Sequence, residues 1–195
     1  MTLGRKVGLA LMGAGLVVSS CSADRKSVSL EALPESTGAS ARLAELRARF
    51  PLGEPAVTHF ELATSTHLRA SFPTETRVRV PRPARVALPL RASQEVELED
   101  ETSRFAIRFT LEQAKSAAVE IAGGLALYRG ALDGDDVVHR VHAEGTEDFV
   151  VFEKRPAREE LTYSVDVSRV PGLRLVSNTL EFLDEGGSPS LRVAP

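Results

Sequence analysis

Apolar and polar residues alternate with a period of two along most of this chain from residue 57 onward. Segment 161–167 is a clear example, because every second residue from Leu161 to Val167 is apolar. Apolar residues also stand at every second position at Val78 and Val80; Val86, Leu88 and Leu90; Val96 and Leu98; Phe105, Ile107, Phe109 and Leu111; and Leu125 and Leu127. Such alternation is typical of strands with one buried and one solvated face.

Turn-forming residues separate these segments. They occur at Arg155–Pro156–Ala157–Arg158, at Asp133–Gly134–Asp135 and at Glu185–Gly186–Gly187. Many short strands joined by turns predict an all-β fold, an antiparallel β-sandwich over residues 51–195. Segment 111–121 (LEQAKSAAVEI) is ambiguous, because it could form a helical turn between strands.

The apolar period changes to about 3.6 before residue 51. Leu43, Leu46 and Phe50 are spaced as on one helix face, Ser40 is a candidate N-cap, and Pro51 ends the pattern. This predicts a short amphipathic helix over residues 40–50, packed on the domain. Residues 21–39 are small and polar, which predicts a flexible tether.

The chain begins with the pattern of a secretory signal. Arg5 and Lys6 precede an apolar run from Val7 to Val18, which Ser19 and Ser20 follow. The run is shorter than the roughly 20 residues that an apolar helix needs to cross a bilayer. We therefore expect residues 1–20 to be cleaved.

Val18–Ser19–Ser20–Cys21 resembles the lipobox of bacterial lipoproteins. The resemblance implies that the thiol of Cys21 takes a diacylglycerol, that cleavage follows just before it, and that the new amino terminus is acylated. Ser22 stands where inner-membrane lipoproteins often carry aspartate, so the resemblance implies a lipid anchor in the cell envelope, at the outer membrane. The alternatives are an ordinary signal peptide with an accidental cysteine and an uncleaved membrane anchor.

Charge and composition exclude one class of partner. Cleavage lowers the number of cations from 24 to 22 against 27 acids, so the mature chain is mildly acidic. Nucleic-acid binding is not expected, since it needs a basic patch interleaved with aromatic residues. Cys21 is the only cysteine, so the fold must form without an internal disulfide.

No candidate for catalysis or metal binding has the required spacing. His139 and His142 point to opposite faces of one strand, and His59 and His67 are isolated. Asp133, Asp135 and Asp136 do not match a calcium loop, the chain has no G-x-S-x-G, and Gly123–Gly124 lacks the rest of a phosphate loop. We expect no metal, no cofactor and no catalytic residue.

Arginines cluster before acidic residues in the middle of the chain. They are Arg69, Arg77, Arg79, Arg82, Arg85 and Arg91, followed by Glu95, Glu97, Glu99, Asp100 and Glu101. Pairing across neighbouring strands would help to set the register. The alternative is that the arginines bind membrane phosphates or an acidic partner.

A second resemblance covers residues 87–195, through GGLALYRG, EGTEDFVVF, TLEFLDEGG and LRVAP. This part is similar to the amino-terminal module of large secreted proteins of gliding soil bacteria, a resemblance that implies no particular activity. Residues 179–184 and 190–193 form a predicted hairpin, after which the chain stops, so the domain could be truncated or begin a longer protein.

The expected function is a lipid-anchored binding or assembly module of the cell envelope, held to the membrane by its N-terminal lipid and engaging an envelope or surface protein. The alternatives are a lipid-anchored hydrolase with dispersed catalytic residues and a truncated remnant of a larger surface protein. A deep pocket with converging histidine and carboxylate groups would favour the hydrolase, and a filled core would favour binding.

Overall fold

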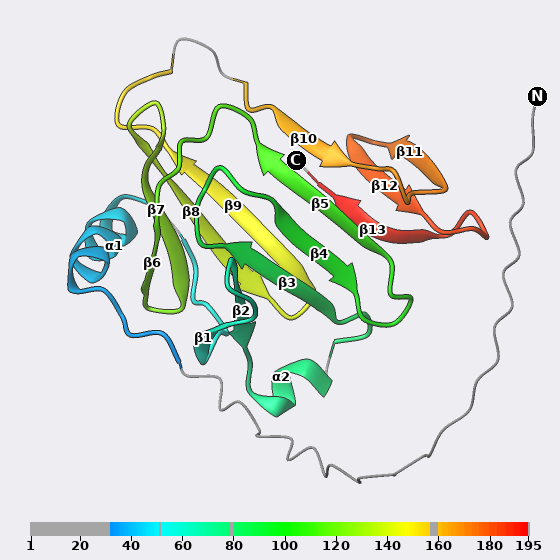
Figure 1. Ribbon diagram of the computed structural model, residues 1–195, viewed down its shortest axis with the longest axis horizontal. Helices are drawn as coiled ribbons and strands as arrows, with labels where there is room; N and C mark the ends of the chain where they lie inside the picture. Colours follow the sequence, from blue (N-terminus) through cyan, green and yellow to red (C-terminus); the bar gives the residue numbers. More distant parts are fainter. Residues whose placement is uncertain (1–31, 51, 79, 157–159, 195) are drawn as a thin grey trace, which may run out of the picture.

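A computed structural model describes residues 32–50, 52–78, 80–156 and 160–194 of the chain. Three antiparallel sheets and a helix before them make up most of these residues (Figure 1). The prediction of an all-β sandwich preceded by one short helix is confirmed. Cys21 and the rest of the predicted signal and lipobox lie outside the described residues.

The largest sheet has six strands in the order β1-β2-β3-β4-β5-β10. Their bounds are β1 His59–Leu62, β2 His67–Ser71, β3 Ala84–Pro89, β4 Val96–Asp100, β5 Ala106–Leu111 and β10 Tyr163–Asp166. The second sheet contains β6 Val119–Ala122, β7 Leu125–Leu132, β8 Asp135–His142 and β9 Gly145–Val151. The third contains β11 Gly172–Val176, β12 Thr179–Leu183 and β13 Pro189–Val193.

One apolar core joins the three sheets. Leu88 and Leu98 of the six-stranded sheet share it with Val141 of the four-stranded sheet and with Phe182 and Leu191 of the three-stranded sheet. The inward residues of β3 and β4 alternate with outward ones, as the sequence pattern predicts. Figure 1 shows β9 and β13 behind β4 and β5, so the two smaller sheets form the second layer of the sandwich.

Helix α1 (Thr37–Arg49) covers the outer face of the four-stranded sheet. Its buried residues Ala39, Leu43 and Leu46 pack with Leu125 and Leu127 of β7 in a second apolar cluster. The alternate residues of β7 face the sandwich core, so this strand is buried on both faces. The prediction that the helix packs on the domain is confirmed.

The helix begins at Thr37, earlier than the predicted 40–50, and Ser36 replaces Ser40 as its N-cap. The Ser36 hydroxyl accepts the Ala39 backbone N–H at 3.3 Å and donates to Glu120 at 2.8 Å. The tether predicted over residues 21–39 is therefore too long at its C-terminal end, because part of it is ordered against the domain. Ala32 pairs with Glu61 of β1, and the Ser36 N–H donates to the carbonyl of Ile121 in β6.

One further segment differs from the sequence prediction, and the structure resolves the ambiguity of segment 111–121. Thr74–Val78 is a short helix, α2, where alternation around Val78 and Val80 indicated a strand. Pro81 and Pro83 follow, and proline has no N–H to donate to a strand ladder. Segment 111–121 contains no helix: the N–H of Lys115 donates to Ala131 at 2.7 Å, and Val119 begins β6.

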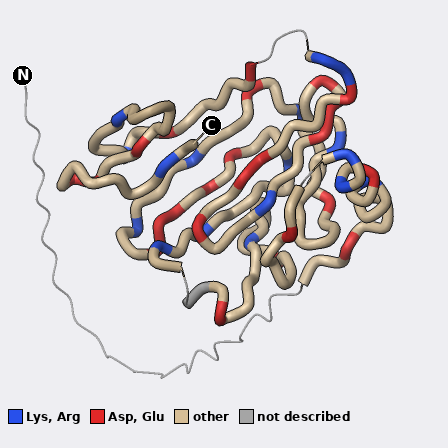
Figure 2. Tube along the Cα trace, turned by 180° about the vertical axis from the view of Figure 1, so that it is seen from behind, with Lys and Arg blue, Asp and Glu red and all other residues tan. Residues whose placement is uncertain are grey.

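The predicted pairing of arginines with acidic residues is found across β3 and β4. Arg85 lies opposite Glu99 and contacts its carboxylate at 3.4 Å. Arg69 differs from the prediction, because it pairs with Glu61 of β1 at 2.7 Å. Figure 2 shows both signs of charge distributed along the strands. Arg79 and the side chain of Arg77 lie outside the described residues.

Candidate functional site

The three-stranded sheet has one apolar face that is only half covered. Cross-strand pairing places Leu173, Phe182 and Leu191 in one row, and Leu175, Leu180 and Val193 in the next. Phe182 is fully buried in the main core, and Leu191 packs beside it. On the same face the side chains of Leu173, Leu175 and Val193 remain 51%, 69% and 49% exposed. We call these three residues the apolar patch.

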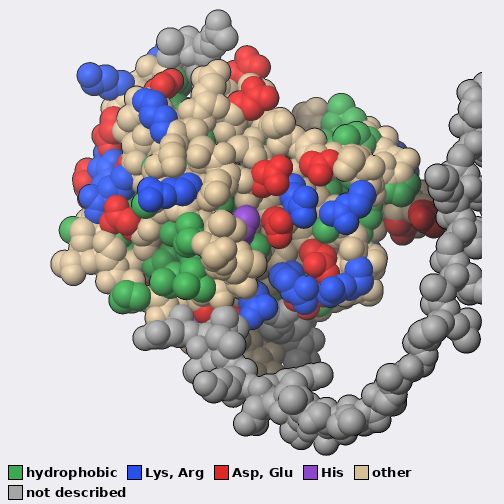
Figure 3. Space-filling view, in the orientation of Figure 1, with side chains coloured by type: hydrophobic (Ala, Val, Ile, Leu, Met, Phe, Trp, Pro, Cys, Tyr) green, Lys and Arg blue, Asp and Glu red, His purple; other side chains and the backbone are tan. Residues whose placement is uncertain are grey.

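The apolar patch lies at the end of the molecule that carries β11 and β12. Figure 3 shows hydrophobic side chains gathered over this end. Single exposed leucines are common on protein surfaces, whereas apolar residues that continue a core face into solvent mark contact surfaces more often. The apolar patch is of the second kind, because Leu173 and Leu191 flank the buried Phe182.

The opposite face of the same sheet is charged. Arg174, Glu181 and Arg192 stand side by side on the three strands, and the Nε atoms of both arginines donate to Glu181 at 2.9 Å. These hydrogen bonds hold the pKa of Glu181 below its usual value. Two guanidinium groups share one carboxylate, so this face keeps one excess positive charge.

Among the described residues, strand β11 forms one edge of its sheet and pairs only with β12. A two-residue turn, Ser177–Asn178, joins the two strands with φ values of 46° and 66°. Positive φ at both positions is the conformation of a tight hairpin turn whose twist matches that of the strands, and asparagine tolerates it. The hairpin holds β11 beyond the main core, with four of its five residues exposed.

A polar cluster lies between the two layers of the sandwich. His139 of β8 pairs across the sheet with Asp148 of β9, and Asp148 accepts a hydrogen bond from the hydroxyl of Tyr163 in β10. The ring of Tyr128 stands edge-on to His139, with centroids 5.6 Å apart, and its hydroxyl donates to Pro89 at 2.7 Å. Sequence analysis did not predict this convergence, because the residues come from four separate strands.

Burial controls the chemistry of this cluster. Burial lowers the pKa of His139, an effect that the negative charge of Asp148 opposes. The Nδ1 atom of His139 has no hydrogen-bond partner among the described residues. Burial and the bond to Asp148 also raise the pKa of Tyr163. The cavity beside these groups measures about 20 Å³, which is room for about one water molecule. A substrate does not fit there.

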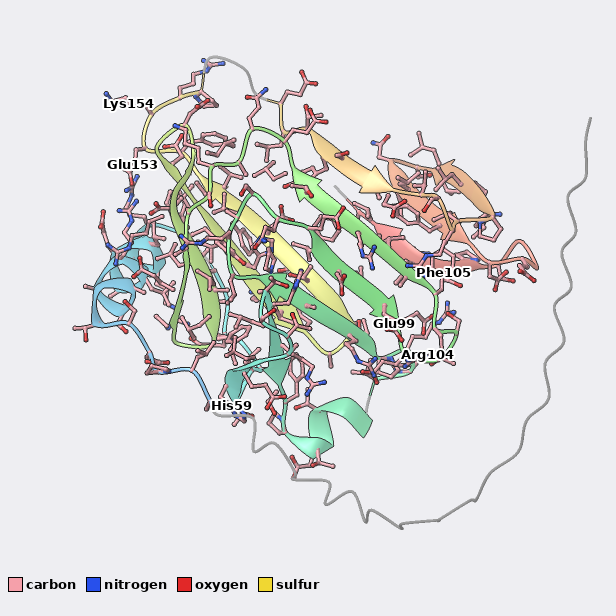
Figure 4. The ribbon with its side chains drawn as sticks, in the orientation of Figure 1. His59, Glu99, Arg104, Phe105, Glu153 and Lys154 are labelled. Carbon is pink, nitrogen blue, oxygen red and sulfur yellow. The ribbon has the colours of Figure 1, made fainter. Side chains whose placement is uncertain are left out.

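A larger hollow of about 360 Å³ lies on the outer face of β4, β5 and the segment after β10. It is lined mainly by charged groups that already pair with one another: Arg108 donates to Glu97 at 2.9 Å, and Arg104 lies 2.8 Å from Glu99. Figure 4 shows Arg104 and Glu99 together at the β4–β5 turn. Paired charges leave this hollow as an ordinary polar surface, with both signs balanced.

The residues considered for metal binding do not come together. His139 points into the core and His142 to the other face of β8, as predicted, while Asp136 binds Arg42 at 2.7 Å. The carboxylate of Asp135 accepts the Glu153 N–H at 3.1 Å. Within the described ranges, no group of three or more histidine, cysteine, aspartate or glutamate residues could hold a metal ion.

Comparison with known proteins found no match to this chain among family models, curated proteins or solved structures. Among the described residues, no helix has the length and hydropathy needed to cross a membrane. The apolar patch is thus the candidate functional site. Its sequence signal is the alternation of Leu173 and Leu175 around Arg174, which sequence analysis did not single out.

Proposed function

We propose that this protein is a lipid-anchored binding or assembly module of the cell envelope, and that the apolar patch contacts its protein partner. The observation that supports the contact surface is the exposure of Leu173, Leu175 and Val193 on a face whose other half is core. The support for the anchor is the signal-like segment that ends at Cys21. Acyl chains on Cys21 would hold the domain at the outer membrane.

The hydrolase alternative has less support. His139, Asp148 and Tyr163 do converge, but the adjoining cavity has room for about one water molecule. The hollow large enough for a small molecule is lined by carboxylates and guanidinium groups that pair with each other. Ser168 hydrogen-bonds Asp166 in that hollow, but no histidine is among its lining residues, so the arrangement lacks the base of a Ser-His-Asp triad.

The anchor is tested by intact mass and detergent partitioning of the natively expressed protein beside a Cys21→Ala variant. We expect the wild type to carry the mass of acyl chains and to partition into detergent, and the variant to lack both properties. Equal behaviour of the two proteins, with no added mass, would refute the anchor and leave a secreted domain.

The contact surface is tested by placing a photo-crosslinking amino acid at position 175 in the native envelope. The matched control places the same amino acid at exposed Glu144, in the segment between β8 and β9. We expect a discrete crosslinked protein from position 175 alone. Equal crosslinking from both positions, or none from position 175, would contradict the proposal.

A further inference from the structure

We infer that the partner supplies a β-strand, which adds antiparallel to the free edge of β11, with apolar residues over Leu173 and Leu175 and a carboxylate facing Arg174. The inference rests on the proposed function and specifies the chemistry of the partner. An edge strand presents a row of unpaired backbone N–H and C=O groups that an extended segment can bind. Strand β11 is such an edge, since β12 is its only neighbour within the part of the chain that the structure describes.

The chain itself bonds to two of the other sheet edges, those of β1 and β6. Ala32 bridges to Glu61, and the Leu33 N–H donates to Phe60, which extends the sheet beyond β1. At β6, the Ser36 N–H donates to Ile121. No described segment covers β11 in this way. An open edge next to an uncovered apolar surface is a site of strand addition unless something protects it.

The apolar patch sets the alternation of the incoming strand. Side chains on neighbouring antiparallel strands pair on the same face of the sheet. A strand added to β11 would therefore place every second residue beside Leu173 and Leu175, which are 51% and 69% exposed. Apolar residues at these positions would extend the rows that already run from Leu173 to Phe182 and from Leu175 to Leu180.

The charged face sets the register. Arg174 stands between the two leucines on the opposite face, and it shares Glu181 with Arg192. One positive charge is left uncompensated there. A carboxylate on the added strand directly opposite Arg174 would neutralise it, and opposite charges at facing positions stabilise a sheet. The expected partner segment therefore alternates apolar and polar residues around a central aspartate or glutamate.

A second copy of this chain fits the edge less well. In the antiparallel register that pairs all of β11 with its own copy, Arg174 would face the Arg174 of that copy. Like charges directly opposite each other destabilise a sheet. A different protein with an acidic residue at this position has the complementary charge.

The test is selection of a displayed random peptide library on the full-length protein, beside the Arg174→Glu and Leu175→Asp variants. We expect the wild type to enrich peptides that alternate apolar and polar residues around one acid. Arg174→Glu should enrich lysine or arginine at that position, and Leu175→Asp should lose the enrichment. Circular dichroism of each variant identifies any that fails to fold, and Leu173→Asp then replaces Leu175→Asp.

The outcomes separate the inference from the proposed function. Enriched peptides that require Leu175 but do not alternate apolar and polar residues would overturn strand addition. So would peptides that still carry the acidic residue when they are selected on the Arg174→Glu variant. Both results would leave the apolar patch as a contact surface. Enrichment that ignores both Leu175 and Arg174 would overturn both. A dimer in light scattering that Leu175→Asp dissociates would assign the edge to a second copy and also overturn the inference.

Discussion

The buried His139 predicts how the stability of this fold depends on pH. Burial lowers the pKa of the folded-state imidazole below its ordinary value of 6.5. Above that value both the folded and the unfolded chain carry neutral His139, so this residue contributes no pH dependence. Below it the unfolded chain binds a proton that the folded chain excludes, and the free energy of unfolding therefore falls as the pH falls.

The slope follows from the linkage between one proton and unfolding. A difference of one proton changes the free energy of unfolding by at most about 1.4 kcal/mol per pH unit. Between about pH 7 and pH 5 the loss from His139 therefore has an upper limit of about 2 kcal/mol. Carboxylates with a lowered pKa, such as Glu147 and Glu181, add their own losses only toward and below 4.5.

The assay is urea denaturation, followed by circular dichroism, of the wild type and a His139→Leu variant across this pH range. Leucine fills a similar volume and binds no proton, while His59, His67 and His142 remain in both proteins as the control. We expect a steeper loss of stability in the wild type. Parallel curves for the two proteins would refute the reasoning, whatever their difference in absolute stability.

Three further substitutions test the packing. Leu46→Ala should lower the free energy of unfolding by about 2–5 kcal/mol in urea denaturation, because Leu46 is fully buried between α1 and the four-stranded sheet; a loss below about 1 kcal/mol would contradict this packing. Tyr163→Phe should cost about 1.5–3 kcal/mol by the same assay, since Asp148 loses its bond from Tyr163, and an unchanged midpoint would argue against that bond. Asn178→Val should lower the melting temperature, because β-branched residues disfavour positive φ, whereas Asn178→Gly should not; equal effects would contradict the turn.

The sequence predicts the sandwich because most strands have only one buried face. Val96 and Leu98 alternate with glutamates for that reason, and the predicted hairpin of β12 and β13 forms. Local pattern is less informative where other contacts decide. Val78 alternates with its neighbours yet ends a helix, and Ser36, which caps α1, also binds Glu120, a residue distant in sequence.

The candidate site could not be predicted from the sequence for a related reason. Leu173 and Leu175 look like ordinary inward strand residues, and only the tertiary arrangement leaves them exposed while Phe182 in the same row is buried. The convergence of His139 and Tyr163 on Asp148 likewise depends on how two sheets stack. Alternation predicts which residues share a face, but it does not predict whether that face is covered.

The entry of the chain at Ala32–Ser36 has a mechanical consequence. This segment bonds first to β1 of one layer and then to β6 of the other, before α1 begins. A pull on the N-terminal side would load these few backbone bonds before it reached the apolar contacts of α1 or the sandwich core. Under load, the backbone hydrogen bonds of this segment would therefore break and re-form first, while both layers keep their structure.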